Sequence, residues 1–439
     1  MTNKATDNNQ PSSKASVEVV TLGCRLNAYE SDKIKAIAEK ATSSDTIVVN
    51  SCAVTTEAIR QSRQQIRKAR RRRPEAKIVV TGCAAQIDPD HFSAMPEVDA
   101  VLGNMEKLSE SEWRKLNTSS GPHLRVNDIM SVKETAGALL ETYGERARAF
   151  LQIQTGCDHR CTFCIIPFGR GNSRSLPINV IVEEAKSLVA QGTHELVLTG
   201  VDMTSYGADL PGTPSLAELV KAILEATPTL FSLRLSSVDC AEVDDALFEL
   251  LVSDDRIAPY LHLSLQSGNN LILKRMKRRH SREQAIDLCQ RLRARRPGFA
   301  FGADIIVGFP TESDEMFEES VTIIDEAGLS FVHVFPYSAH DQTPASRMPQ
   351  VEKLIIKQRA ARLRQAAAEA LDRLHEKMLG DTQAAIIESG GRVRFRNFAS
   401  ARLHTNGEQS PHAGKVARFS INKIVDGTLL ASLTPQSGA

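Results

Sequence analysis

Residues 156–164 read Gly156-Cys157-Asp158-His159-Arg160-Cys161-Thr162-Phe163-Cys164, so three cysteines form a CxxxCxxC pattern. Three thiolates on one short loop can hold three irons of a cubic [4Fe–4S] cluster and leave the fourth iron without a protein ligand. An iron with an open position can bind and activate a small molecule, whereas a cluster with four cysteine ligands normally only carries electrons. The pattern therefore predicts a reactive iron–sulfur site.

Two other uses of these cysteines are open. A structural zinc site has a complete set of four protein ligands, usually from two CxxC pairs. Only Cys161 and Cys164 form such a pair in this chain. A thioredoxin-like redox pair is also possible, but it would leave Cys157 without a role. His159 lies inside the triad, and its neighbours Asp158 and Arg160 predict a solvent-exposed loop.

Length and composition indicate a protein of several domains. The chain has 439 residues, eight cysteines and a formal net charge of +1. Residues 1–16 are polar and are expected to be disordered. Because this segment has no apolar signal region and no later apolar run could span a bilayer, the sequence predicts a soluble cytoplasmic protein. Cysteines in such a protein favour metal binding or catalysis over disulfides.

A second set of cysteines follows a repeated pattern near the N-terminus. Three apolar strands run directly into Cys24, Cys52 and Cys83, which are 28 and 31 residues apart. These intervals fit βα units, with helices near 29–40 and 54–73. Since parallel strands place their carboxyl ends on one edge of a sheet, the three thiols are expected to converge. The repeat predicts a second metal cluster, again with three cysteine ligands.

From residue 150 onward, strands and helices alternate in six larger units. The expected strands are 150–154, 195–199, 232–236, 260–265, 303–307 and 331–335. The expected helices are 178–191, 214–226, 243–252, 282–295 and 313–327. Six βα units predict a partial (βα)6 barrel, whose working residues lie at the carboxyl ends of the strands. The CxxxCxxC loop follows the first strand at that end.

The triad loop and this barrel resemble the radical S-adenosylmethionine enzymes. The N-terminal repeat is similar to the auxiliary-cluster motifs of the methylthiotransferases within them. The matching segments are Thr21-Leu22-Gly23-Cys24-Arg25-Leu26-Asn27, Asn50-Ser51-Cys52-Ala53-Val54-Thr55, Thr81-Gly82-Cys83-Ala84-Ala85-Gln86, Cys164-Ile165-Ile166-Pro167-Phe168-Gly169-Arg170-Gly171 and Asp304-Ile305-Ile306-Val307-Gly308-Phe309-Pro310. The likeness covers residues 17 to about 377.

The resemblance implies cofactors and site residues. Cys157, Cys161 and Cys164 would hold a [4Fe–4S] cluster that binds S-adenosylmethionine and cleaves it by one-electron reduction. Cys24, Cys52 and Cys83 would hold a second [4Fe–4S] cluster that carries the sulfur to be inserted. The radical would be generated at the first cluster, without a catalytic side chain. Residues at barrel strand ends are expected to contact S-adenosylmethionine: Gly200, Ser236, Gln266 and Gly308.

Among the methylthiotransferases, the motifs around Cys24, Cys52 and residues 334–338 are most similar to the branch that acts on threonylcarbamoyladenosine beside the tRNA anticodon. The expected reaction replaces the C2–H of N6-threonylcarbamoyladenosine at position 37 with a methylthio group. This branch usually continues from Tyr-Ser with a basic pair and Gly-Thr-Pro, whereas this chain reads Ala339-His340-Asp341-Gln342-Thr343-Pro344. The alternatives are the isopentenyladenosine branch and, in a different class, a non-radical iron–sulfur electron-transfer or RNA-binding protein.

Two basic segments are candidates for contact with RNA. Residues 60–73 carry eight Lys or Arg and no acidic residue, and Arg60, Arg63, Arg67 and Arg71 share one helix face. Residues 274–279 form the second cluster. Such stripes can follow phosphates, although a solvated helix face explains a charge run equally well. The expected partners are the tRNA anticodon stem-loop, a reductant such as flavodoxin or ferredoxin, and a sulfur donor.

The C-terminal region is expected to form a small all-β domain after a helix at 352–378. Its strands are expected at 383–388, 392–403, 415–424 and 428–432, with Arg392, Arg394 and Arg396 on one strand face. The position resembles the RNA-binding TRAM domain of the family. The expected organisation is an α/β chain with a tail (1–16), a methylthiotransferase domain (17–128), a radical S-adenosylmethionine core (146–378) and this domain (381–439). Cys240 and Cys289 are expected to be structural.

Overall fold

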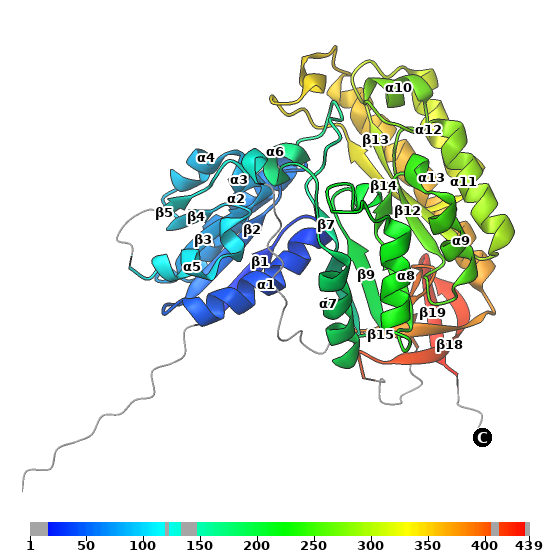
Figure 1. Ribbon diagram of the computed structural model, residues 1–439. Coiled ribbons are helices and arrows are strands. Elements are labelled where there is room, and N and C mark those ends of the chain that lie inside the picture. Colours follow the sequence, from blue (N-terminus) through cyan, green and yellow to red (C-terminus); the bar gives the residue numbers. More distant parts are fainter. Residues whose placement is uncertain (1–15, 119–122, 133–146, 405–411, 435–439) are drawn as a thin grey trace, which may run out of the picture.

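The computed structural model describes residues 16–118, 123–132, 147–404 and 412–434, which form three adjoining units (Figure 1). The predicted disordered tail lies outside these residues, except for Ser16. The backbone N–H of Ser16 donates to Asp45 Oδ1 at 2.9 Å, so this residue belongs to the edge of the first unit. In the described part of the chain, no helix has both the length and the apolar character needed to cross a bilayer.

The N-terminal unit is a five-stranded parallel sheet in sequential order. Its strands are β1 (Val17–Thr21), β2 (Thr46–Ser51), β3 (Lys77–Gly82), β4 (Ala100–Leu102) and β5 (His123–Arg125). Its helices are α1 (Arg25–Ala41), α2 (Thr56–Arg72), α3 (Cys83–Ile87), α4 (Pro89–Ser93) and α5 (Glu110–Lys115). Every residue of β2 is buried, because helices cover both faces of the sheet. The two predicted crossover helices correspond to α1 and α2.

The carboxyl edge of this sheet holds the three cysteines of the repeat. Cys24 is the N-cap of α1, Cys52 follows β2, and Cys83 is the first residue of α3. Gly82 adopts a φ of 94°, and a Cβ at this position would lie 2.3 Å from the carbonyl oxygen of Ser51. Only glycine fits this turn, which directs the chain from β3 into α3.

The central unit is a half barrel of parallel strands. The three strands on one side are β6 (Arg148–Gln152), β9 (Glu195–Thr199) and β10 (Ser232–Leu235). The four on the other side are β11 (Ser237–Val238), β12 (Tyr260–Gln266), β13 (Ala300–Val307) and β14 (Leu329–Pro336). Ser236 interrupts the third predicted strand, so that β10 and β11 belong to separate sheets. A short antiparallel pair, β7 (Gln154–Thr155) and β8 (Arg174–Ser175), flanks the triad loop.

Helices cover the outside of the half barrel (Figure 1). They are α7 (Ile178–Ala190), α8 (Leu216–Ala226), α9 (Asp245–Ser253), α11 (Arg282–Arg295), α12 (Asp314–Glu326) and α13 (Lys353–Met378), and the short α6 (Ile166–Arg170) and α10 (Asn270–Arg275) lie in strand-end loops. Leu261, Leu263 and Leu265 of β12 alternate outward into the large core beneath these helices. The predicted partial (βα)6 barrel is confirmed.

The C-terminal unit is a small closed barrel with strands β15 (Thr382–Glu388), β16 (Arg392–Phe395), β17 (Ser400–Leu403), β18 (Val416–Val425) and β19 (Thr428–Leu433). The prediction of one strand over 392–403 is wrong, because this segment forms two antiparallel strands, β16 and β17, joined by a turn. Phe398 has a φ of 76°, and Asn397 Oδ1 accepts a hydrogen bond from the N–H of Ala399, which closes the turn. Arg396 therefore lies in the turn and not on the strand face of Arg392 and Arg394.

Candidate active site

The CxxxCxxC loop is anchored by backbone contacts at the carboxyl end of the barrel. Gly156 begins it with a φ of 74°, and a Cβ there would lie 1.8 Å from the carbonyl oxygen of Asn172. The N–H of Cys157 donates to Gly171 O at 3.1 Å, and that of Thr162 donates to Met276 O at 3.1 Å. The loop is thus held from both sides, which presents its three thiols at the mouth of the barrel.

The thiols of this loop differ in their electrostatic surroundings. Burial of the thiol raises the pKa of Cys164 to about 12, and burial together with the Asp202 carboxylate also raises the pKa of Cys157. Burial acts in the same direction on Cys161, but a hydrogen bond from His159 and the charge of Arg278 outweigh it and lower the pKa of Cys161. Burial disfavours the thiolate forms of Cys157 and Cys164, and a bound metal cation would stabilise them, so the donor set fits a thiolate-bound metal.

Arg278 was not expected at this site, and His159 was expected on a solvent-exposed loop. The side chain of His159 is only 8% exposed, and its Nε2 lies 3.3 Å from Asp202 and 3.4 Å from Glu242. The loop is therefore exposed at Asp158 but turned inward at His159, which corrects the prediction of an exposed loop. Arg278 Nη1 lies 3.6 Å from Cys161 Sγ. This guanidinium belongs to the cysteine site rather than to a basic surface.

Cys24, Cys52 and Cys83 come together at the edge of the N-terminal sheet. A Cβ on Gly23 would lie 2.7 Å from Cys52 Sγ, which places the Cys24 loop directly against Cys52. Burial raises the pKa of Cys52 to about 11, and the neighbouring thiols of Cys83 and Cys24 add to this rise. Three converging sulfur donors again fit a thiolate-bound metal.

The spacing of the sulfurs distinguishes a cluster from a single ion. Among the described residues, three groups place their possible ligand atoms within 4.8 Å of one another, and neither cysteine triad is among them. Each triad is thus too widely spaced for all three sulfurs to surround one tetrahedral ion, for which ligand bonds are about 2.3 Å. A larger iron–sulfide group fits this spacing better.

Helix α6 connects the two cysteine sets. It begins two residues after Cys164, and a Cβ on Gly169 would lie 3.1 Å from the Cβ of Cys83. Gly169 O also accepts a hydrogen bond from Asn104 of the N-terminal unit. The segment that follows one triad therefore packs directly on the other, and α6 lies beside α3 where the N-terminal unit meets the half barrel (Figure 1).

A buried ion network fixes this junction. Arg170 donates from Nη1 to Glu30 Oε1 at 2.8 Å, and Lys107 Nζ donates to Glu30 Oε2 at 2.7 Å. Burial opposes ionisation of Glu30, but these two cations hold its pKa at about 2. The Cys83 and Cys24 sulfurs contribute to a raised pKa of Arg170. Sequence reasoning missed this network, although Arg170 lies six residues beyond Cys164 in a quoted motif.

The four residues expected to contact S-adenosylmethionine all lie at carboxyl ends of barrel strands. Gly200 follows β9 and Ser236 follows β10, and both contact Met203. Gln266 ends β12 with a φ of 72°, and Gly308 follows β13. The structure therefore places them on the same rim as the CxxxCxxC loop.

Gly308 also has a packing role on this rim. Its N–H donates to Glu312 Oε2 at 2.8 Å. Its φ is 72°, and a Cβ would lie 2.4 Å from Ile356 Cγ1 of α13. The absence of a side chain is thus explained by helix packing.

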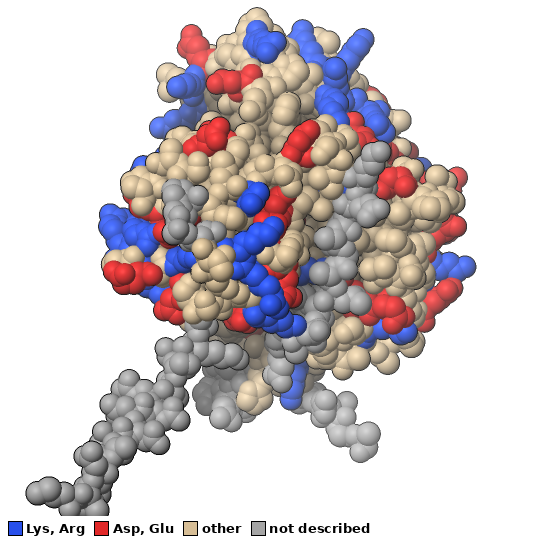
Figure 2. Space-filling view, turned by 60° about the vertical axis from the view of Figure 1, so that its left-hand side comes forward, with Lys and Arg blue, Asp and Glu red and all other residues tan. Residues whose placement is uncertain are grey.

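The basic run of α2 is largely paired. Its ion pairs join Arg60 to Glu57, Arg67 to Glu97, Arg70 to Asp99, Arg72 to Glu18 and Arg73 to Asp45. These acidic partners come from other elements or from the start of the helix. The surface around α2 is therefore less positive than its run of basic residues suggests. Figure 2 shows the same mixture, with Lys and Arg side chains interspersed with Asp and Glu.

Cys240 and Cys289 are both buried. Cys240 lies beside Asp239 and His280, but His280 donates or accepts with both ring nitrogens, at Asp239 Oδ1 and Leu265 O, each 3.1 Å away. Cys289 lies in α11 within the large core. These contacts are consistent with the structural role expected of both residues.

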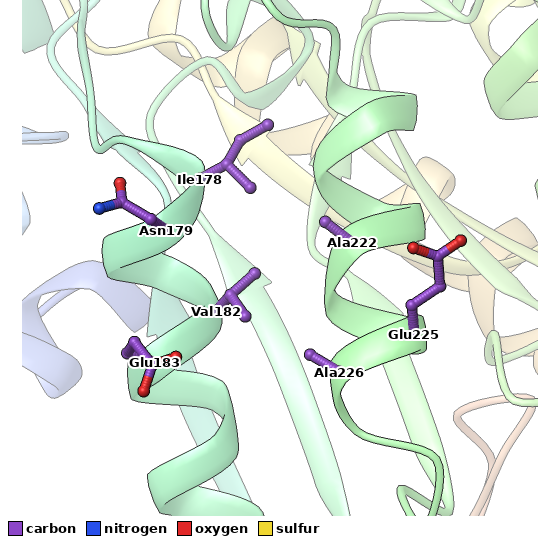
Figure 3. Close-up of a pocket in the computed structure, with 7 residues that line it drawn as sticks. All are labelled: Ile178, Asn179, Val182, Glu183, Ala222, Glu225 and Ala226. Atoms are coloured by element: carbon purple, nitrogen blue, oxygen red, sulfur yellow. The ribbon is translucent and has the colours of Figure 1, made fainter.

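A shallow groove on the outside of the half barrel lies between α7 and α8 (Figure 3). Ile178, Val182, Ala222 and Ala226 line it, with Glu183 and Glu225 beside them. No cysteine lines the groove, and its carboxylates would repel an anionic cofactor. It contributes nothing to the site at the strand ends.

Comparison with known proteins agrees with this arrangement. Residues 151–324 match the radical SAM superfamily, and residues 16–103 match the uncharacterized protein family UPF0004. The chain is 50% identical to threonylcarbamoyladenosine tRNA methylthiotransferase MtaB of Rickettsia prowazekii (strain Madrid E), over 88% of this chain and 91% of that protein. It is 36% identical to the protein of the same name from Aquifex aeolicus (strain VF5), over 91% and 98%.

A solved structure supports the fold. The radical S-adenosylmethionine methyltransferase TsrM from Kitasatospora setae aligns with a TM-score of 0.53 and 15% identity, over 73% of this chain and 69% of that chain. At this identity the likeness concerns architecture only. The sequence relatives, however, match nearly end to end, and this chain belongs to the radical S-adenosylmethionine methylthiotransferase family.

Proposed function

We propose that this enzyme replaces the C2–H of N6-threonylcarbamoyladenosine at position 37 of tRNA with a methylthio group. The reaction type rests on one observation: the chain carries two cysteine triads, and α6, which follows one triad, packs on the other. One triad alone would support radical chemistry, but insertion of sulfur needs a second site that presents it. The relatives that share 50% and 36% identity bear the threonylcarbamoyladenosine name, which supports this substrate.

The family uses [4Fe–4S] clusters together with S-adenosylmethionine. In our proposal, Cys157, Cys161 and Cys164 hold the cluster that binds S-adenosylmethionine, and Cys24, Cys52 and Cys83 hold the cluster that presents sulfur. When bound, these groups supply the electron, the radical and the methylthio group. The protein's own residues hold the two sites in register through α6, and Gly200, Ser236, Gln266 and Gly308 form the rim on which S-adenosylmethionine would lie.

The remaining partners follow from the same chemistry. The substrate RNA is the anticodon stem-loop, and the small C-terminal barrel, residues 381–439, is proposed to assist in binding it. Reductive cleavage requires an electron donor such as flavodoxin or ferredoxin, and repeated turnover requires a sulfur donor. We place the enzyme in the cytoplasm, with the methylthiotransferase domain at 17–128 and the radical core at 146–378.

The alternative substrate is isopentenyladenosine, and the alternative class is a non-radical iron–sulfur protein. Nucleoside analysis of tRNA from a deletion strain separates them. Loss of the methylthio group from threonylcarbamoyladenosine alone supports our proposal, whereas loss from isopentenyladenosine would replace it. Complementation with the C157A/C161A/C164A variant is the control for radical chemistry, and restoration of the methylthio group by this variant would exclude a radical mechanism.

A further inference from the structure

Arg25 directly follows Cys24 and begins α1, yet its side chain reaches the other two units. Its guanidinium lies 5.8 Å from the centroid of the Phe398 ring, in the turn of the small barrel. Phe398 in turn stacks on Tyr260 of β12, with the ring centroids 4.6 Å apart. Arg25 is therefore placed where the N-terminal sheet, the half barrel and the small barrel meet.

The neighbouring guanidinium groups all have carboxylate partners. Arg148 pairs with Glu195 at 2.6 Å and with Glu388 at 2.8 Å. Arg234 pairs with the same Glu195 at 2.7 Å, and Arg394 pairs with Glu388 at 3.2 Å. The carboxylates of Glu195 and Glu388 thus pair with these three arginines.

The third nearby carboxylate is also occupied. Asp304 Oδ1 accepts hydrogen bonds from His262 Nε2 at 2.8 Å and from His333 Nδ1 at 3.1 Å. Tyr260 Oη lies 3.0 Å from His262 Nδ1 and extends this chain of contacts. Asp304 therefore acts on Arg25 through its charge but forms no ion pair with it.

Arg25 makes no hydrogen bond or ion pair with any residue that the structure describes. Its guanidinium lies over a ring face, and such an interaction uses none of the N–H donors of the guanidinium. Arg148 and Arg234 lie near Arg25 and add like charge to this place. An arginine remains charged in such surroundings, and no carboxylate among the described residues pairs with this one.

We propose that Arg25 binds the carboxylate of an amino acid attached to N6 of the substrate adenosine and thereby determines substrate specificity. The inference rests on the proposed function, in which the substrate carries a threonyl carboxylate. An isopentenyl group has no charge to offer and would leave the guanidinium unpaired, which is costly in a partly buried place. The N6 substituent and C2–H project in different directions from the adenine ring. Cys24 and Arg25, adjacent in the chain, can therefore serve the reacting carbon and the substituent separately.

The test compares binding of three anticodon stem-loops that differ only at the target base. One carries threonylcarbamoyladenosine, one its neutral methyl ester, and one unmodified adenosine. Affinities are measured by fluorescence anisotropy on the reconstituted holoenzyme and on the R25Q and R25K variants. R364Q, which changes an exposed arginine of α13, is the matched control. Iron content and circular dichroism show whether each variant keeps its clusters and its fold.

We expect wild-type enzyme and R364Q to prefer the acid over the ester by roughly tenfold to a hundredfold, as for a hydrogen-bonded charge pair. R25Q should bind all three stem-loops equally, with its affinity for unmodified adenosine unchanged, and R25K should keep part of the preference. A preference that persists in R25Q overturns the inference, as does a wild type that does not distinguish acid from ester. Nucleoside analysis reports the proposed function separately, since tRNA methylthiolation does not depend on this comparison.

Discussion

Glu195 shows how a single buried charge supports the half barrel. Its carboxylate is 1% exposed and lies between Arg148 Nε at 2.6 Å and Arg234 Nη2 at 2.7 Å, and it also accepts from Ser232 Oγ at 2.9 Å. Burial raises the pKa of a carboxyl group, but the two guanidinium groups outweigh this effect and hold the pKa of Glu195 at about 2. The ionised form is therefore the one that stabilises the fold.

We predict that E195Q destabilises the protein by about 3–5 kcal/mol at neutral pH, because it leaves the buried Arg234 without its carboxylate and Arg148 with Glu388 alone. The pKa of Glu195 in the folded state lies below its ordinary value. The ionised carboxylate therefore makes its full contribution to the free energy of unfolding above about pH 4.5, and this contribution is lost as the pH falls toward about 2. Urea unfolding at pH 7 and at pH 3 measures this change, and the difference between wild type and E195Q should shrink at the lower pH.

The exposed carboxylate Glu183, which pairs with Lys186 at 2.8 Å, provides the control. E183Q should change the free energy of unfolding by less than about 1 kcal/mol, as expected for a surface pair. A difference between wild type and E195Q that stays constant from pH 7 to pH 3 would contradict the assigned role of Glu195.

At the scale of elements, the contact between β13 and α13 depends on Gly308. Its left-handed φ of 72° and the close approach of Ile356 both exclude a side chain. Gly298 has a similar φ of 84°, but nothing lies within 4 Å of its missing Cβ. The two glycines therefore separate the cost of backbone conformation from the cost of packing.

We predict that G298A costs about 1–2 kcal/mol, from the left-handed backbone alone. G308A should cost a further 1–3 kcal/mol or so, because α13 must move away from the strand end. Chemical denaturation of both variants measures the two values. Equal costs would show that α13 yields without penalty and that Gly308 is not required for packing.

The basic elements show where charge in the sequence and charge in the structure differ. The guanidinium of Arg278 contacts Cys161 Sγ inside the molecule. Arg396 donates to the carbonyl oxygens of Asp255 and Ile257 on the half barrel. Both lie in segments that were candidates for contact with RNA. Each instead joins two elements, because a guanidinium with several donors satisfies carbonyl or sulfur acceptors at such junctions.

At the scale of the whole molecule, the two triads belong to separate units that meet at α6. We predict about eight irons per chain in the reconstituted protein and about four after C157A/C161A/C164A or C24A/C52A/C83A, because each triad holds its own [4Fe–4S] cluster. Iron and sulfide determination under anaerobic conditions provides the counts. C289A, which changes a cysteine in the core of α11, should keep the full content.

A variant that loses all iron when only one triad is removed would show that the clusters do not form independently. The Arg170–Glu30–Lys107 network would be the physical link in that case, since it spans both units. Loss of no iron from either variant would contradict the assignment of the cysteines as ligands.

Local patterns were sufficient for much of the architecture. The apolar runs ending in Cys52 and Cys83 indicated buried parallel strands, and both are present as β2 and β3. Convergence of the three repeat cysteines followed from the same rule, because parallel strands end on one edge. The hairpin at Phe398 escaped prediction, since a non-glycine residue with positive φ gives no clear signal in the sequence.

The sequence by itself determined the three units, the cysteine triads and the family, because strand period, loop length and cysteine spacing are local properties of the chain. Only the tertiary structure decided which side chains surround the triads. Arg170 meets Glu30 across 140 residues, and Arg278 meets Cys161 across 117. Such partners depend on how whole units pack, and the same packing leaves Arg25 without a carboxylate at the place where all three units meet.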